Sequence, residues 1–450
     1  MFDAGQMILI IGLLLGLVFL GVHIAVALGV TAGVGLYIMM QGNFDVIFEF
    51  LSTTAYVAIR GYIFAVIPLF MLMGEFLARS GVAGDLFRLV NRLTRWLPGH
   101  LGVATVIANA IFAFVTGVSV AAAAAFSRIA YPQMKRYGYE RMLSLSCVAG
   151  SSCLGMLIPP SVLLIVWAVL TEQSIGRLFL AGIIPGLLLT VAYMGYIIFT
   201  AIRSPERVGK LRKDADAVAV EAAAERERED DADMAGALVG TLAVVALVLG
   251  ILFGIWLGFF TPTEGAGVGA AAGLVIALLR GMKPREIFEV ILSVGRTSAP
   301  LLLLLVMAQL YARVLSLTGV TGGIETLLVN SPLTPLMILG VMILIWLVLG
   351  CLIDSISIIL LTVPIFAPVA VAIGIDPLAF AIMGIIAIEA GLLTPPFGIL
   401  VYTVKAALPE ENIPVFEIFR GTIPFWFLMI GLVVVIIAFP QVATWLPSLS

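Results

Sequence analysis

Apolar runs long enough to cross a lipid bilayer recur along this chain and restrict what it can fold into. Examples are MILIIGLLLGLVFLGV at 7–22, GALVGTLAVVALVLGILFGIWLGFF at 236–260 and FWFLMIGLVVVIIAF at 425–439. A helix needs about 20 apolar residues to span the hydrocarbon core, and it satisfies its backbone hydrogen bonds within the segment. Only 11% of the residues are charged, against about a quarter in soluble proteins. The chain is therefore predicted to be an all-α polytopic membrane protein.

The two halves of the chain resemble each other. The motif GMLIPP at 155–160 lies 236 residues before GLLTPP at 391–396, and the same offset separates Ser119 from Ser355. Nearer the start of each half, an offset of 240 separates the tripeptide IFE at 47–49 from its copy at 287–289. Matches in the same order at a nearly constant offset indicate an internal duplication. We place the first repeat at 1–202, a charged cytoplasmic linker at 203–234 and the second repeat at 235–450.

Basic residues indicate which loops face the cytoplasm. Segments 79–100 and 133–141 are rich in Arg and Lys, and the positive-inside rule places both in the cytoplasm. The apolar segment between them must leave and return on the same side, which predicts a re-entrant hairpin at about 101–132. Its counterpart at about 335–372 has no flanking Lys or Arg and should enter from the opposite side. We therefore predict an inverted repeat with about ten transmembrane helices, two re-entrant hairpins and a periplasmic N-terminus.

Two adjacent prolines interrupt an apolar helix in each half. Because proline has no N–H to donate to the carbonyl four residues earlier, we predict broken helices at 155–160 and 391–396. The carbonyl groups freed in this way would be those of Gly155, Met156, Gly391 and Leu392. Thr394 adds a hydroxyl in the second half, where the first half has Ile158. Neutral oxygens of this kind suit a hard monovalent cation such as Na⁺.

The predicted hairpin tips carry the sequences TGVS at 116–119 and IDSIS at 353–357. Ser and Asp are common N-caps, and helix N-termini favour anions. One tip and one proline break in each half would form two pseudo-symmetric ion sites with an anion-accepting cavity between them. The cavity candidates are Thr116, Gly117, Pro160, Ser161, Asp354 and Pro396. The same residues could also be ordinary kinks and caps within a helix bundle.

Several segments resemble the large membrane subunit (DctM-like) of tripartite ATP-independent periplasmic (TRAP) transporters. They are GEFLARSGVAGDLFRLVNRLTRWLPGH at 74–100, SSCLGMLIPPS at 151–161, LGCLIDSISIILLTVPIFAPV at 349–369 and EAGLLTPPFG at 389–398. The resemblance covers nearly the whole chain. It implies an inverted-repeat, elevator-type secondary transporter of a bacterial inner membrane. It also implies import of small organic acids such as C4-dicarboxylates, sialic acids or other sugar acids.

The resemblance further implies Na⁺ as the coupling ion and two protein partners. The partners are a separate small membrane subunit (DctQ-like) of about four spans and a periplasmic substrate-binding protein (DctP-like). Carried onto this sequence, the implied Na⁺ residues are Ser119, Gly155 and Pro159 in the first half and Ser355, Ser357, Gly391, Thr394 and Pro395 in the second. Because Ile158 stands opposite Thr394, the two ion sites cannot be chemically identical.

Soluble-enzyme motifs and nucleic-acid-binding patterns are not found in the sequence. There is no Walker A motif for ATP and no H-E-x-x-H zinc motif, which favours a transporter over an enzyme. Three alternatives stay open at this point: a stand-alone anion symporter without partner proteins, a passive channel, and a membrane-embedded hydrolase. The scarcity of His and of paired carboxylates argues against the hydrolase.

Overall fold

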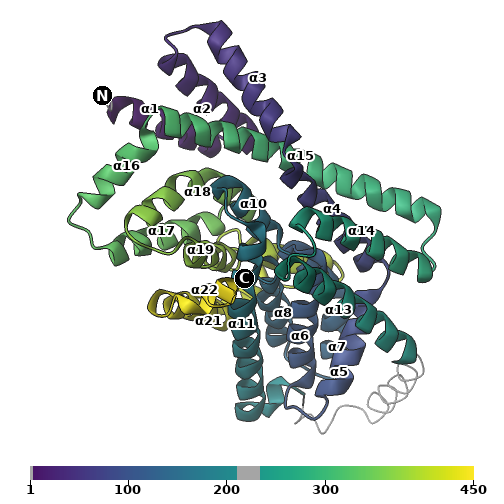
Figure 1. Ribbon diagram of the computed structural model, residues 1–450. Helices are drawn as coiled ribbons and strands as arrows, with labels where there is room; N and C mark the ends of the chain where they lie inside the picture. The colour runs from purple at the N-terminus through teal and green to yellow at the C-terminus, as the bar shows by residue number, and fades with distance from the viewer. Residues whose placement is uncertain (1–3, 210–233, 450) are drawn as a thin grey trace.

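The computed structural model describes residues 4–209 and 234–449, and every regular element in these ranges is helical (Figure 1). Eight of these helices are long and apolar enough to cross a membrane. Six further apolar helices have 10–17 residues, so length and composition alone do not reach the predicted count of about ten spans. The predicted charged linker at 203–234 falls mostly on residues 210–233, which lie outside the described part of the chain.

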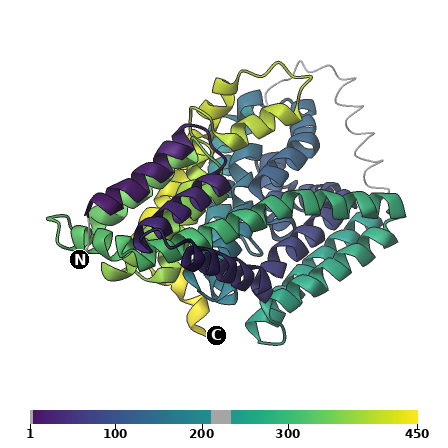
Figure 2. The same cartoon turned by 90° about the horizontal axis from the view of Figure 1, so that it is seen from above.

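One group of helices surrounds the long helix α15. Helices α1, α2 and α3 lie beside α15 in both views (Figures 1 and 2), and α4 packs against α14 and α15. Polar caps begin several of them: Asn43 accepts the N–H of Val46 at the start of α3, and Thr261 and Glu264 form a capping box at the start of α14. The bounds in this group are α1 Ala4–Phe19, α2 Ile24–Met39, α3 Phe44–Arg60, η1 Tyr62–Ala65, α4 Val66–Arg79, α14 Pro262–Leu279, α15 Pro284–Leu317 and α16 Val320–Val329. Helices α5 Val82–Thr94 and α13 Met234–Trp256 pack on each other, and α5 also packs on α6 (His100–Thr116).

A second group contains two helical hairpins and two interrupted helices. Helices α6 (His100–Thr116) and α7 (Ser119–Arg136) form one hairpin, and α17 (Pro335–Gly350) and α18 (Ser355–Ala372) form the other. The first interrupted helix consists of α8 Arg141–Ser152, α9 Leu154–Leu157 and α10 Val162–Thr171, and the second of α19 Pro377–Gly391 and α20 Ile399–Ala407. The remaining elements are α11 Ile175–Arg203, η2 Pro205–Arg207, α21 Val415–Ala438, α22 Gln441–Thr444 and η3 Leu446–Leu449.

The two halves of the chain share one core around the hairpins. Trp167 of α10 meets Trp346 of α17 with ring centroids 5.8 Å apart, and Phe380 of α19 lies 5.1 Å from Trp346. The Trp346 indole N–H donates to Thr362 Oγ1 of α18 over 2.8 Å. Aromatic pairs of this kind contribute about 0.5–1.5 kcal/mol each beyond the area they bury. The hairpins and interrupted helices are thus held as one packed unit.

Ion pairs join the two halves at the end of this unit that we predict to be cytoplasmic. Arg141 at the start of α8 contacts Glu417 of α21 through two hydrogen bonds of 3.0 and 2.6 Å. Lys135 near the end of α7 donates to Glu411 in the loop after α20. These contacts connect the first hairpin and the first interrupted helix to the second half of the chain, more than 270 residues away in sequence.

Candidate hairpin-tip and broken-helix site

The tip of the first hairpin packs directly on the first proline break. The Val162 N–H, just after the break, donates to the carbonyl oxygen of Gly117 in the tip over 3.3 Å. Gly117 has φ +60°, and a Cβ there would lie 2.5 Å from the carbonyl oxygen of Pro160. A Cβ on Gly155 would lie 3.2 Å from the Ser119 backbone nitrogen. Only glycine permits this approach of tip and break at Gly117, because both the backbone angle and the space exclude a side chain.

The tip of the second hairpin packs on the second proline break in a related way. The Phe397 N–H donates to the Cys351 carbonyl oxygen over 3.2 Å. A Cβ on Gly391 would lie 2.6 Å from Gly350 Cα, at the end of α17. Asp354 caps α18, because its Oδ2 accepts the Ser357 N–H over 3.0 Å and its Oδ1 accepts the Ser357 hydroxyl over 2.5 Å. The Pro159–Pro160 and Pro395–Pro396 bonds are both cis.

Carbonyl groups that proline leaves without a helical donor find other partners. Ser161 Oγ donates to the Met156 carbonyl oxygen over 2.5 Å and also caps α10. The Thr394 N–H donates to the Gly391 carbonyl oxygen over 2.9 Å. The carbonyl oxygens of Met156 and Gly391 thus each accept one hydrogen bond from a nearby group in place of the helical N–H. A serine or a tightened turn next to a proline break supplies the missing donor locally.

The two breaks differ in exposure although their sequences match. Residues 151–161 are buried throughout, whereas Pro395, Pro396 and Phe397 are exposed, with 58% of Phe397 accessible. The Thr394 hydroxyl is half-buried and donates to the Ala390 carbonyl oxygen over 3.0 Å. Thr116 is also half-buried, and its hydroxyl donates to the Phe112 carbonyl oxygen over 3.3 Å. The first site is thus enclosed and the second is open on one side.

A buried carboxylate lies between the two tips and was not among the predicted site residues. Glu389 of α19 is 1% exposed, and its Oε1 accepts the Ser355 hydroxyl over 2.8 Å. Ser119 of the other tip approaches the same carboxylate. Within the described residues, Glu389 Oε2 and Ser119 Oγ are both buried without a hydrogen bond of standard geometry. An acidic residue in an apolar segment five positions before Thr394 was the only sequence signal for it.

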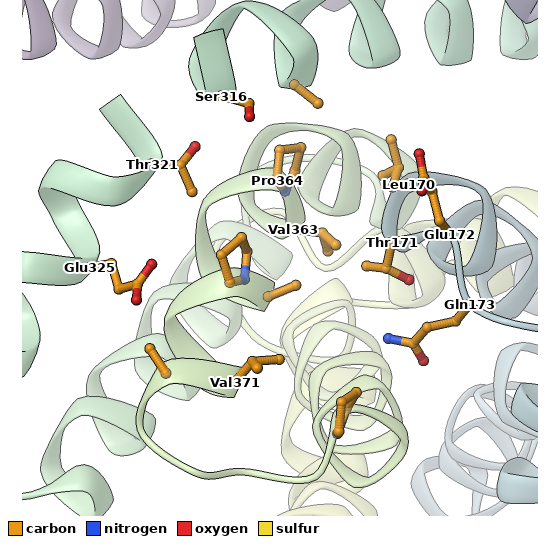
Figure 3. Close-up of a pocket in the computed structure, with 15 residues that line it drawn as sticks. Leu170, Thr171, Glu172, Gln173, Ser316, Thr321, Glu325, Val363, Pro364 and Val371 are labelled. Carbon is orange, nitrogen blue, oxygen red and sulfur yellow. The ribbon is translucent and has the colours of Figure 1, made fainter. Parts of the chain in front are cut away.

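A separate cleft of about 630 Å³ separates the second hairpin from α15 and α16. Thr321 and Glu325 of α16 line one wall and Val363 and Pro364 of α18 another, with Glu172 at the end of α10 on the rim (Figure 3). Its lining contains two carboxylates and no Lys or Arg. A carboxylate ligand would meet only like charge here, so the cleft does not extend the hairpin-tip site.

Comparisons with known proteins identify the family. A model of the tripartite ATP-independent periplasmic transporter, DctM component, matches residues 11–442. The chain belongs to this family. It is 34% identical over 86% of both chains to the C4-dicarboxylate TRAP transporter large permease protein DctM of Pseudomonas aeruginosa. It is 30% identical to the protein of the same name from Rhodobacter capsulatus, over 98% of this chain and 99% of the relative. The expected DctM-like membership is thereby confirmed, as is a transporter subunit rather than an enzyme.

A solved transporter structure supports the fold. The YdaH transporter of Alcanivorax borkumensis superposes with a TM-score of 0.60 over 90% of each chain, at 15% sequence identity. At that identity the likeness concerns the fold alone. The all-α membrane-transporter fold class predicted from the sequence is confirmed.

Proposed function

We propose that this TRAP large permease imports small organic acids together with Na⁺ by an elevator movement of the hairpin unit. The observation that carries the proposal is that each of two hairpin tips closes on a broken helix around buried polar atoms. Inverted repeats with substrate and ion sites at broken helices near the bilayer midplane are typical of secondary transporters. The proposal includes the inverted topology and the division into repeats at 1–202 and 235–450 that the sequence predicts.

The residues at the two tips fit a Na⁺ ion. Hard cations prefer hydroxyl, carbonyl and carboxylate oxygens, and Ser119 Oγ is a buried hydroxyl without a partner in the described part of the chain. The residues proposed to hold the ions are Ser119, Gly155 and Pro159 in the first half and Ser355, Ser357, Gly391, Thr394 and Pro395 in the second. When bound, Na⁺ supplies positive charge near the substrate carboxylate.

The substrate is proposed to lie between the tips. Thr116, Gly117 and Ser161 border the first side of this space. Asp354, Pro160 and Pro396 complete the candidate set. Bound Na⁺ would add positive charge to the partial charges at the N-termini of α7 and α18, and together they favour an anion beside Glu389. The relatives above are named for C4-dicarboxylates. The Asp354 carboxylate is occupied in capping α18, so we assign it to holding the tip rather than to contact with an acid.

The proposed assembly has three proteins in a bacterial inner membrane. The family description names a tripartite transporter of which this chain is one component. We propose that a DctQ-like small membrane subunit and a DctP-like periplasmic binding protein are the other two. The N-terminus of the large subunit is proposed to be periplasmic. Reconstitution of all three proteins should give sodium-driven succinate uptake, whereas uptake by this chain alone would favour a stand-alone symporter.

Thermal unfolding of the purified chain tests the ion sites. The midpoint is measured in NaCl and in KCl at equal ionic strength, because a ligand that binds only the folded state raises it by mass action. We expect a sodium-specific rise that Thr394→Ala removes. Thr403→Ala is the matched control, since Thr403 is also half-buried and also donates to the carbonyl oxygen four residues earlier. Equal midpoints for the wild type in the two salts would contradict sodium binding at these sites.

A further inference from the structure

Glu389 lies where a carboxylate is costly to place. It belongs to α19, is 1% exposed, and takes part in no ion pair among the described residues. A buried carboxylate is tolerated only when hydrogen bonds or opposite charge compensate for lost water. Its surroundings must therefore provide that compensation.

The compensation comes from the two hairpin tips. The Ser355 hydroxyl donates to Oε1 over 2.8 Å, and Ser119 approaches the same carboxylate from the other hairpin. Ser355 and Ser119 are the first residues of α18 and α7. Each helix N-terminus carries roughly half a positive charge, so two of them together can balance one carboxylate.

The internal repeat pairs Glu389 with a residue that it contacts. The residue 236 positions before Glu389 is Cys153, and the Cys153 thiol donates to the Glu389 carbonyl oxygen over 3.8 Å. Equivalent positions of the two halves thus touch, which would place them beside the pseudo-twofold axis of the predicted inverted repeat. A single carboxylate beside such an axis can accept hydrogen bonds from both tips. A second carboxylate in place of Cys153 would bring two negative charges close together.

We infer that Glu389 is a shared positioning residue that anchors both hairpin tips, Ser355 through Oε1 and Ser119 through Oε2. The two unpartnered buried atoms, Oε2 and Ser119 Oγ, mark the contact with the first tip. Through this anchor, an ion bound at one tip affects the geometry of the other. The functional meaning rests on the proposed function, whereas the anchor itself can be tested without sodium.

The test begins with thermal unfolding of the full chain in sodium-free KCl. We compare Glu389→Gln, which keeps the shape and removes the charge, with Ser119→Ala, Ser355→Ala and the double variants. We expect each serine substitution to lower the midpoint in the wild-type background and to lose most of that effect in Glu389→Gln. Ser127→Ala is the control, because Ser127 is fully buried in α7 but donates to the Ala123 carbonyl oxygen, and its effect should add to that of Glu389→Gln.

The double variants distinguish a Glu389 that contacts both hairpin tips from one that contacts only the second. Residues that do not share a partner have additive effects. Additivity between Glu389→Gln and Ser119→Ala would show that Glu389 serves only the second hairpin, and the inference would fail. If Glu389→Gln does not fold, the Ser119→Ala and Ser355→Ala pair decides: effects that add overturn the anchor, and effects that do not add support it.

Sodium titration gives a readout that a merely structural residue would not change. A hydrogen bond to a charged group contributes about 1.5–3 kcal/mol, equivalent to at least a tenfold change in affinity. We expect Glu389→Gln to raise the sodium concentration for half of the midpoint shift about tenfold or more, and Ser127→Ala to leave it unchanged. An unchanged value in Glu389→Gln overturns the inference. If the wild type shows no sodium-specific shift, the proposed function fails, and the KCl experiments alone judge the anchor.

Discussion

Gly117 is the position where one methyl group should separate the first hairpin tip from its proline break. Gly117→Ala would place a Cβ 2.5 Å from the Pro160 carbonyl oxygen and 3.5 Å from Ser161 Cα. Both are backbone atoms in the buried segment 151–161, so they cannot make room as a flexible side chain could. The tip would have to move, and the hydrogen bond from Val162 to the Gly117 carbonyl oxygen would be lost or lengthened.

The magnitude follows from two separate costs. A left-handed backbone conformation costs an L-residue about 1–2 kcal/mol, and Gly117 has φ +60°. Forcing an extra methyl into a packed site costs about 1–3 kcal/mol more. The free energy of unfolding should therefore fall by about 2–5 kcal/mol, less the roughly 0.4–1 kcal/mol that alanine contributes by restricting the unfolded chain.

Gly374→Ala isolates the first cost, the left-handed backbone conformation, so the difference between the two variants measures the second. Gly374 has φ +82° but nothing within 4 Å of an added Cβ, so it should lose only the conformational part. We expect the thermal midpoint in KCl to fall at least twice as far in Gly117→Ala as in Gly374→Ala. We also expect the sodium-specific rise to survive in Gly374→Ala and to be reduced in Gly117→Ala. Equal falls in the two variants would refute the reasoning, because they would mean that the tip does not pack on the break.

Three further outcomes are expected. Gly391→Ala should lower the thermal midpoint, since its Cβ would lie 2.6 Å from a backbone atom, whereas Gly340→Ala, with open space around it, should leave it unchanged or raise it. Asp354→Ala should cost about 0.5–2 kcal/mol by removing a helix cap, and Asp354→Asn should restore most of the midpoint. Lys135 lowers the pKa of Glu411, so this pair stabilises the fold above the ordinary carboxyl pKa of about 4.3, and the contribution is lost as the pH falls through the lowered value. Lys135→Met should therefore lower the midpoint at pH 7 by an amount that shrinks in high salt and as the pH falls below about 4, and a pH-independent difference would contradict this assignment.

Local chemistry explains which parts of the site could be read from the sequence. The lack of an N–H on proline applies in any fold, so the interruptions at 158–161 and 392–398 follow directly from the two Pro-Pro pairs. Asp354 as a cap of α18 follows from the same kind of short-range rule. The fate of the freed carbonyl oxygens did not follow, because Ser161 and the Thr394 N–H compete for them at distances of a few residues.

Long-range contacts explain what the sequence could not reveal. Glu389 meets Ser355, 34 positions earlier, only after the second hairpin folds back on α19. Its approach to Ser119 spans the two halves of the chain. An offset between repeats can pair the serines with each other, but it cannot show that a third residue lies between them. The unequal burial of the two proline breaks is also a tertiary property, since their sequences are nearly the same.

That unequal burial bears on how the proposed transport cycle would begin. The first break is enclosed, while Pro395, Pro396 and Phe397 are exposed beside the second tip. Asp354 on the same tip is also exposed, and a carboxylate does not face lipid hydrocarbon without a large cost. The opening at the second tip therefore leads to water or to a polar partner surface. On the proposed function, Na⁺ exchanges first at the Ser355 side in this state, and the shared Glu389 carboxylate conveys its presence to the enclosed Ser119 side.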